Sequence, residues 1–595
     1  MSSDRARARG PRRGRAEVVW SLALALLILA PTLPAGYILL RDMVFTPRQP
    51  FTPSAFGLGS TLPRAVPIDA VMAALTSGVP GMVVQKVALV GTLTAAGLGA
   101  ARLIPAQSRI ARCAAASLYL WNAYVAERLL LGHWTLLIAY AALPWLVGSL
   151  LRVRAGDRGA APGVVLLLGL CALTPGGGLL AALMAAPLLL WPGSDVRRRT
   201  SWLLLGGLIL VNAPWWLPGL LAPGRAASGA AGVDAFAARA ELPLGTLGSL
   251  VGLGGVWNAQ AVPTSRGLIL AAVLAVVIPI VAVLGWRPLR AAWGRTAGAL
   301  ALSASVGLLL AWVGSLPLLA PGLRWAVIHV PGAGLLRDGQ RLVAPLALLL
   351  ALMVPLAVER LSDRVGEPVG RAALLLLPAL LPLVVLPDLA WGAWGRLEPV
   401  AYPSDWQQVR AVLVESPPGT TSGDVVALPW QTFRQFAWNG DRTMLDPAPR
   451  YLDRTTVVDD SLVVGSQVVP GEDPRAAAVG SALRPGTPMT ESLPSLGIGW
   501  VLIEKGTPGD VPPGLLVGAS LVFEGRDLAM YRLGDGSGDG RGLGAGALGS
   551  GDWGVGPPGS WIVLAVDVGV VLVLTGCVGA VLRTRRRTAA TVEYT

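Results

Sequence analysis

The chain alternates long apolar runs with short arginine clusters, and this pattern constrains its fold more than any other feature of the sequence. A helix needs about 20 mostly apolar residues to cross the hydrocarbon core of a bilayer. Arginine clusters occupy every second gap between the runs, as expected for loops on the cytoplasmic side. The pattern therefore predicts a polytopic α-helical membrane protein with about 12 spans. The predicted spans are 17–40, 80–101, 111–131, 134–151, 162–174, 177–193, 201–221, 267–286, 297–319, 341–358, 372–390 and 560–582.

Composition supports a membrane protein and argues against a nucleic-acid-binding one. The chain is 53% hydrophobic and 14% charged, whereas soluble proteins carry about 25% charged residues. The net charge is +13, and the basic residues responsible for it lie between apolar runs instead of on one soluble face. We therefore expect membrane lipid and no nucleic acid among the partners.

The arginine pattern also predicts an orientation. It indicates a multi-pass plasma-membrane protein with both termini in the cytoplasm and an extracytoplasmic α/β domain between the last two spans. The predicted organisation is a basic cytoplasmic tail (1–16), a transmembrane domain of about 11 spans (17–390), the small α/β domain (391–533), a Gly-rich linker (534–559), a last transmembrane helix (560–582) and a second cytoplasmic tail (583–595).

Ionisable and polar side chains gather at the extracytoplasmic mouths of the predicted spans. A single residue of this kind is often an interfacial anchor or part of a structural ion pair. Charge near the membrane midplane is unfavourable, so a group of ionisable residues at the mouths on one side indicates a function. Guanidinium groups in particular match the oxygens of a phosphate. The cluster consists of Arg41, Asp42, Asp69, Glu127, Arg128, His133, Arg337, Asp338, Gln340 and Arg341.

Three segments carry a family resemblance: "RDMVFTP" after the first run, "LYLWNAYVAERLLLGHWTLLIAYAALPW" (118–145) and "LLRDGQRLVAPLALLLA" (335–351). In these the chain resembles GT-C class membrane glycosyltransferases, and most of all the actinobacterial arabinofuranosyltransferase-like proteins of cell-wall arabinan assembly. The resemblance covers roughly residues 17–390. It implies a GT-C-like fold for the transmembrane domain.

The resemblance also implies a chemistry. Asp42 matches the catalytic aspartate of the first extracytoplasmic loop. The other nine residues of the cluster are expected to bind substrate because of their placement at the same mouths, not because of the resemblance. The donor would be a polyprenyl-phosphate-linked sugar, such as arabinofuranose or mannose, and the acceptor a cell-envelope glycan or lipid, with transfer by inversion. Many members carry two acids where this sequence has Asp42 alone, so participation of a divalent cation stays open; no other cofactor is expected.

Two other functions fit parts of the sequence. A transporter or flippase of lipid-linked sugars would also have many spans, but it would place charge at the membrane midplane, whereas here charge collects at one mouth. An inactive GT-C-like scaffold that recruits envelope enzymes through 391–533 is the second alternative. The sequence does not reveal whether the protein has protein partners.

Overall fold

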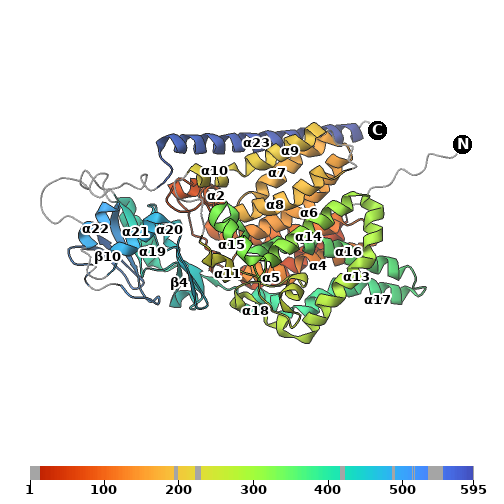
Figure 1. Cartoon of the computed structure of the whole chain (residues 1–595), viewed down its shortest axis with the longest axis horizontal. Coiled ribbons are helices and arrows are strands. Elements are labelled where there is room, and N and C mark those ends of the chain that lie inside the picture. Colours follow the sequence, from red (N-terminus) through yellow and green to blue (C-terminus); the bar gives the residue numbers. More distant parts are fainter. Residues whose placement is uncertain are drawn as a thin grey trace.

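The computed structural model describes residues 14–192, 198–221, 229–415, 423–484, 489–511, 514, 516–533 and 554–593. A bundle of helices and a smaller sheet domain lie end to end (Figure 1). The bundle agrees with the predicted helical membrane protein, and the sheet domain with the predicted α/β unit.

Within the described ranges, eight helices are long and apolar enough to cross a membrane. Each coincides with one of the predicted runs. They are α1 (Arg15–Leu29), α3 (Gly81–Leu103), α6 (Trp134–Arg154), α13 (Ile269–Trp293), α14 (Thr296–Val313), α16 (Ala344–Ser362), α17 (Pro368–Val385) and α23 (Pro557–Glu593).

The other four predicted spans are interrupted or short, so the predicted count of about 12 is not confirmed. The run 111–131 splits into α4 (Arg109–Leu120) and α5 (Ala123–Leu130). Asn122 causes the break, because its Nδ2 donates to the carbonyl of Tyr119 at 2.9 Å while its Oδ1 accepts from the backbone N–H of Val125 at 3.1 Å. One side chain thus satisfies the end of one helix and the start of the next.

The predicted spans 162–174, 177–193 and 201–221 also differ from single full-length helices. Helices α7 (Ala161–Cys171) and α8 (Pro175–Leu190) are apolar but fall short of a full span. Helices α9 (Arg198–Val211) and α10 (Ala213–Leu221) would pass together as one span, but they are bent by 60°. Between the spans lie the shorter helices α2 (Ile68–Thr76), α11 (Ala231–Ala235), α12 (Gly245–Val251), α15 (Ala320–His329) and α18 (Ala390–Gly395).

The sheet domain has three layers. Five strands run in the order β10–β11–β9–β3–β6, with β3 parallel to both β9 and β6 and the other pairs antiparallel. Successive residues of a strand point to opposite faces, so Val425 packs with helix α19 while Val426 packs with α21. The bounds are β3 (Asp424–Leu428), β6 (Thr456–Val457), β9 (Ile498–Glu504), β10 (Ser520–Glu524), β11 (Leu528–Arg532), α19 (Ser404–Glu415) and α21 (Pro474–Ala482); the remaining elements are α20 (Ala448–Tyr451), β7 (Leu462–Val464), β8 (Gln467–Val469) and α22 (Met489–Ser495).

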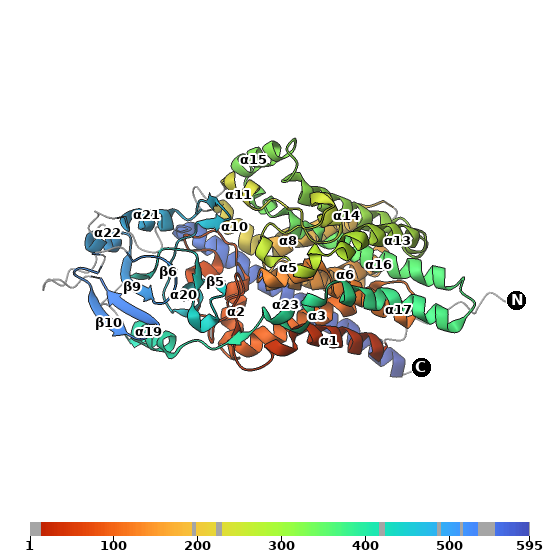
Figure 2. The same cartoon turned by 90° about the horizontal axis from the view of Figure 1, so that it is seen from below.

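The segment after α1 joins the two parts of the molecule. Strand β1 (Tyr37–Ile38) pairs antiparallel with β2 (Pro399–Val400) at the start of the sheet domain. Leu39 and Val44 are buried in the core of that domain. Figure 2 shows α1 running along the bundle toward this junction.

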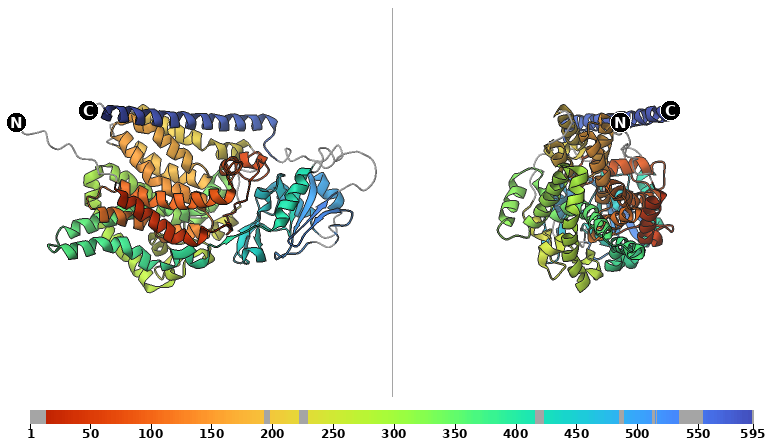
Figure 3. Two further views of the ribbon diagram at one scale, coloured as in Figure 1. Left: turned by 180° about the vertical axis from the view of Figure 1, so that it is seen from behind. Right: turned by 90° about the vertical axis from the view of Figure 1, so that its right-hand side faces the viewer.

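Helix α23 lies on the outside of the bundle, against α7 and α10. Figure 3 shows it running along one edge, with its final turns at the end remote from the sheet domain. Of the predicted Gly-rich linker, 534–553 lies outside the described residues, as do 1–13 and 594–595 of the two predicted tails.

Candidate functional site

Asp42 lies on a tight loop held between the bundle and the sheet domain. Residues Leu40 and Met43 close the loop with two backbone hydrogen bonds, of 3.2 Å and 2.9 Å, and Arg41 takes the left-handed φ of +46°. The Arg41 backbone N–H donates to Thr443 at 2.7 Å, and the N–H of Leu445 donates back to Arg41 at 2.9 Å. Strand β5 (Thr443–Leu445) of the sheet domain therefore positions the loop.

A buried ion cluster fixes β5 in turn. Strand β5 pairs with β4 (Phe433–Gln435), whose Arg434 is fully buried. Arg434 forms ion pairs with Asp446, at 2.6 Å, and with Glu504 of β9. Since a buried guanidinium needs such partners, the hairpin has little freedom to move.

The other side of the loop rests on the end of α5. The backbone N–H of Asp42 donates to the carbonyl of Leu131 at 3.2 Å. The next residue, Gly132, has a φ of +77°, and a Cβ there would meet the backbone of Leu40 and Met43 and lie 2.8 Å from the Asp42 nitrogen. Only glycine lets the two backbones approach this closely.

A chain of polar contacts begins at the Asp42 carboxylate. His133 Nε2 lies 3.1 Å from Asp42 Oδ2, and His133 Nδ1 lies 2.9 Å from Nη1 of Arg128. A guanidinium can only donate, so Nδ1 accepts and the ring proton is on Nε2, directed at Asp42. The Asp42 side chain is 44% exposed. No hydrogen bond to its second oxygen is found among the described residues, so that oxygen can meet a ligand.

Arg128 organises the centre of the cluster. Its buried guanidinium makes two bonds with Asp338, of 2.8 Å and 3.2 Å, and a further bond with Gln340. Burial raises the pKa of Asp338, but the charge of Arg128, with smaller effects from Arg341 and His133, lowers that pKa to about 2. The Arg128–Asp338 pair is therefore ionised at neutral pH.

This pKa makes a prediction about stability. Because the folded-state pKa of Asp338 is below the ordinary value of about 3.9, its ion pair stabilises the fold above about pH 4 and is lost as the pH falls toward 2. Asp338→Asn should lower the free energy of unfolding at pH 7 by about 2–3 kcal/mol and flatten the acid dependence. Thermal unfolding in detergent between pH 2 and 7 measures this. Asp234→Asn, at an exposed ion pair, is the control. An Asp338 variant with the acid dependence of the wild type would contradict the assignment.

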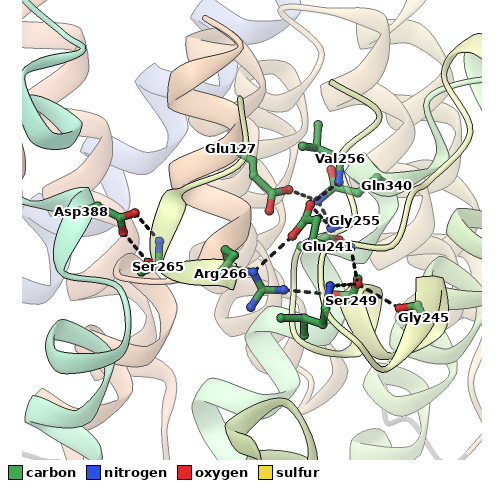
Figure 4. A network of polar contacts seen from close by, with 12 residues as sticks. Glu127, Glu241, Gly245, Ser249, Gly255, Val256, Ser265, Arg266, Gln340 and Asp388 are labelled. Atoms are coloured by element: carbon green, nitrogen blue, oxygen red, sulfur yellow. Dashed lines mark hydrogen bonds and ion pairs between the residues drawn. The ribbon is translucent and has the colours of Figure 1, made fainter. Parts of the chain in front are cut away.

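Glu127 belongs to a second buried network, which also contains Glu241 and Arg266 (Figure 4). Its Oε2 accepts from Gln340 at 3.0 Å, so Gln340 joins the two networks. Glu241 lies close by, held by the backbone N–H groups of Gly255 and Val256 and by Arg266 at 3.2 Å. Burial and then the charge of Glu241 raise the pKa of Glu127 well above its ordinary value.

The arginines of the RDGQR segment differ in their partners. Arg337 pairs with Glu472 of the sheet domain at 2.9 Å. Arg341 bonds only to the carbonyl of Leu335, and its Nε is buried without a hydrogen-bond partner in the part of the chain described here. Arg341 is thus the arginine of this segment that a bound anion could engage.

Asp69 and Arg41 contact other parts of the molecule. Asp69 pairs with Arg450 of the sheet domain at 3.2 Å, and no contact with the Arg128 network is found for it among the described residues. The Arg41 guanidinium donates to the carbonyl of Leu130 at 2.5 Å and to the side chain of Gln260 at 3.3 Å. The described residues contain no group of three or more His, Cys, Asp or Glu side chains arranged to hold a metal ion.

Sequence reasoning missed Glu241 and Arg266. Both lie in a long irregular segment between spans, where no helical or strand period points to a shared site. Their opposite charges 25 residues apart gave no usable signal.

An apolar groove borders Arg266. It runs between the α4–α5 break and helices α13 and α17, and it is lined by Trp121, Asn122, Ile278, Pro382 and Leu386 among others. Its walls are those of a site for an aliphatic chain, with one guanidinium at its edge.

Comparison with solved structures finds this fold in an arabinofuranosyltransferase, the kind of protein to which the sequence resemblance pointed. One similar structure is that of arabinofuranosyltransferase AftD from Mycobacteria, solved by cryo-EM, with a TM-score of 0.54 and 18% identity over 88% of this chain. A mutant of AftD gives a TM-score of 0.51 at 18% identity. This chain spans 40% and 42% of the length of those two AftD chains. Neither a family model nor a curated protein matches the sequence.

Proposed function

We propose that this protein is an inverting glycosyltransferase that uses a polyprenyl-phosphate-linked sugar and acts on the extracytoplasmic side of the plasma membrane. The observation that carries the proposal is the half-exposed Asp42 carboxylate, oriented by His133 and backed by a cluster of arginines. The GT-C fold supports it. Arabinofuranose, the sugar in AftD's name, is our first choice of donor group, with a mannose-like sugar second.

Asp42 would act as the general base. Its unoccupied oxygen takes the proton of an acceptor hydroxyl while that hydroxyl oxygen attacks the anomeric carbon of the donor. The bond from that carbon to the phosphate oxygen breaks, and the phosphate leaves with the bonding electrons. Attack and departure on opposite faces invert the anomeric centre. His133, Arg128 and Asp338 serve as positioning residues.

Arg341 would hold the leaving phosphate. It lies near the Arg128–Asp338 pair and engages no carboxylate directly among the described residues, unlike Arg128 and Arg337. A guanidinium at this place neutralises the charge that develops as the glycosyl bond breaks. The apolar groove beside Arg266 would take part of the polyprenyl chain. Cell-envelope glycan or lipid would be the acceptor.

Arg341→Ala tests the phosphate role. We expect a higher donor KM and a lower kcat, with kcat/KM reduced about 10- to 100-fold, because charged hydrogen bonds contribute about 1.5–3 kcal/mol. The assay follows a labelled polyprenyl-phosphate sugar with purified protein in lipid nanodiscs. Arg324→Ala, an exposed arginine already paired with Asp234, is the matched control. Unchanged kinetics in Arg341→Ala would show that Arg341 does not bind the donor phosphate.

A further inference from the structure

Helix α18 contains a left-handed turn, which is unfavourable for L-residues. Trp391, Gly392, Ala393 and Trp394 have φ values of 53°, 70°, 49° and 59° with ψ between 38° and 59°. Three of the four are not glycine. Strain of this kind persists where the surroundings enforce it, and it is frequent at functional sites.

The turn sorts large and small side chains onto opposite faces. Gly392 and Ala393 are buried, and the turn packs on α1 and on the residues that follow it. A Cβ on Gly392 would lie 2.9 Å from the carbonyl oxygen of Leu397. Trp391 and Trp394, three residues apart, are 60% and 71% exposed.

The two tryptophans lie where a membrane boundary is expected. Span α17 ends at Val385, six residues before Trp391, and β2 of the sheet-domain junction begins at Pro399. Tryptophan is enriched at the level of lipid headgroups because its ring is apolar and its N–H is polar. An exposed indole pair at this level therefore suits contact with lipid.

Two guanidinium groups bond to the same residue, Gln260, near this turn. Arg396 donates to the backbone carbonyl of Gln260, whose side chain accepts from Arg41 at 3.3 Å. Burial lowers the pKa of Arg41 to about 10, and the nearby charge of Arg396 acts in the same direction. Two guanidinium groups bonded to the same residue favour an anion between or beside them.

Asp388 and Asp42 lie close enough for their charges to act on Arg396 and Arg41. Their hydrogen bonds, however, go to other residues. Asp388 accepts from the backbone and hydroxyl of Ser265, at 2.8 Å and 2.5 Å. Asp42 accepts from His133, and Glu398 pairs with Arg442 at 3.2 Å. Arg396 itself is half-buried and forms no ion pair with a carboxylate among the described residues.

We propose that Arg396, with Arg41 behind it, binds the phosphate of a membrane lipid whose chains lie against Trp391 and Trp394. This lipid-phosphate site is separate from the donor phosphate proposed at Arg341. The ligand class is a lipid phosphate, either a polyprenyl monophosphate or a glycerophospholipid.

Native mass spectrometry of the full chain in detergent tests the site by counting bound lipids. The probes are a polyprenyl monophosphate, phosphatidylglycerol and the phosphate-free polyprenol. The variants are Arg396→Gln and the double variant Trp391→Ala/Trp394→Ala, with Arg324→Gln as the control for an arginine that has a carboxylate partner. We expect each test variant to bind one phosphate lipid fewer than wild type, or at least tenfold more weakly, and the control to match wild type.

The probes separate the two lipid sources. If the wild type binds polyprenyl monophosphate but not phosphatidylglycerol at this site, the ligand is an isoprenoid phosphate. If it binds phosphatidylglycerol equally well, the ligand is an ordinary phospholipid. Either result supports the site. In wild type, inorganic phosphate should compete, which tests the site even if Arg396→Gln fails to fold. Wild-type lipid counts in a folded Arg396→Gln, absence of competition, or equal binding of polyprenol would overturn the proposal. Asp42→Asn should keep this lipid, so failure of the proposed transferase leaves the result intact.

Discussion

Asp42→Asn is expected to reduce sugar transfer by about 10²–10⁴-fold, the contribution typical of a general base. Asparagine retains an oxygen that can accept from His133 Nε2, which lies 3.1 Å from the native carboxylate, so the loop should keep its place. What it loses is the ability to take a proton. Transfer from a labelled polyprenyl-phosphate sugar, measured in membranes and in nanodiscs, gives the effect directly.

The control for this variant is Asp234→Asn, which removes an exposed carboxylate paired with Arg324 and should leave transfer unchanged. Both variants should express and unfold like the wild type. Full transfer by Asp42→Asn would remove Asp42 from the mechanism. A wild-type protein without transfer activity that moves lipid-linked sugar across vesicles, or only recruits envelope enzymes, would favour the transporter or the scaffold instead.

Gly132→Ala is expected to lower the free energy of unfolding by about 2–5 kcal/mol and to abolish transfer. A left-handed conformation costs an L-residue roughly 1–2 kcal/mol, and overpacking adds about 1–3 kcal/mol. The added methyl would meet the backbone of Leu40 and Met43, on the loop that carries Asp42. Thermal unfolding in detergent and the transfer assay measure the two effects.

Gly156→Ala provides a matched control. Gly156 also has a positive φ, of +87°, but nothing lies within 4 Å of a Cβ placed there. It should lose only about 1–2 kcal/mol from backbone strain and keep its transfer activity. Equal stability and activity in the two variants would show that Gly132 does not pack against the Asp42 loop.

The contact between two parts of the cluster could be expected from the sequence because both parts flank apolar runs at one predicted face. The segments around Arg128 and Asp338 are 210 residues apart, yet both flank apolar runs at the same predicted face, and the structure joins them by ion pairs at 2.8 Å. The eight spans followed in the same way from length and hydropathy. Individual roles did not follow, because the pairing of Arg337 with Glu472 and the lack of a carboxylate for Arg341 depend on tertiary contacts.

Other features had no local signal. The break between α4 and α5 depends on a single capping side chain, Asn122, inside a run whose average composition suits an unbroken span. The backbone bonds between Arg41 and β5 join segments about 400 residues apart, with no side-chain pattern to announce them. The left-handed turn Trp391–Trp394 could not be predicted from the sequence either, because three of its four residues normally avoid that conformation.

The backbone bonds between Arg41 and residues Thr443 and Leu445 also restrict how such a protein can be rebuilt. A chimera that exchanges the sheet domain for that of a relative would insert a foreign hairpin beside the loop that carries Asp42. For the chimera to keep the loop in place, the loop that carries Arg41 and Asp42 and the β4–β5 hairpin would have to come from the same protein. In relatives with this fold, the loop and the hairpin should therefore vary together. Gene fusions that combine them from different proteins should give proteins in which the loop is misplaced.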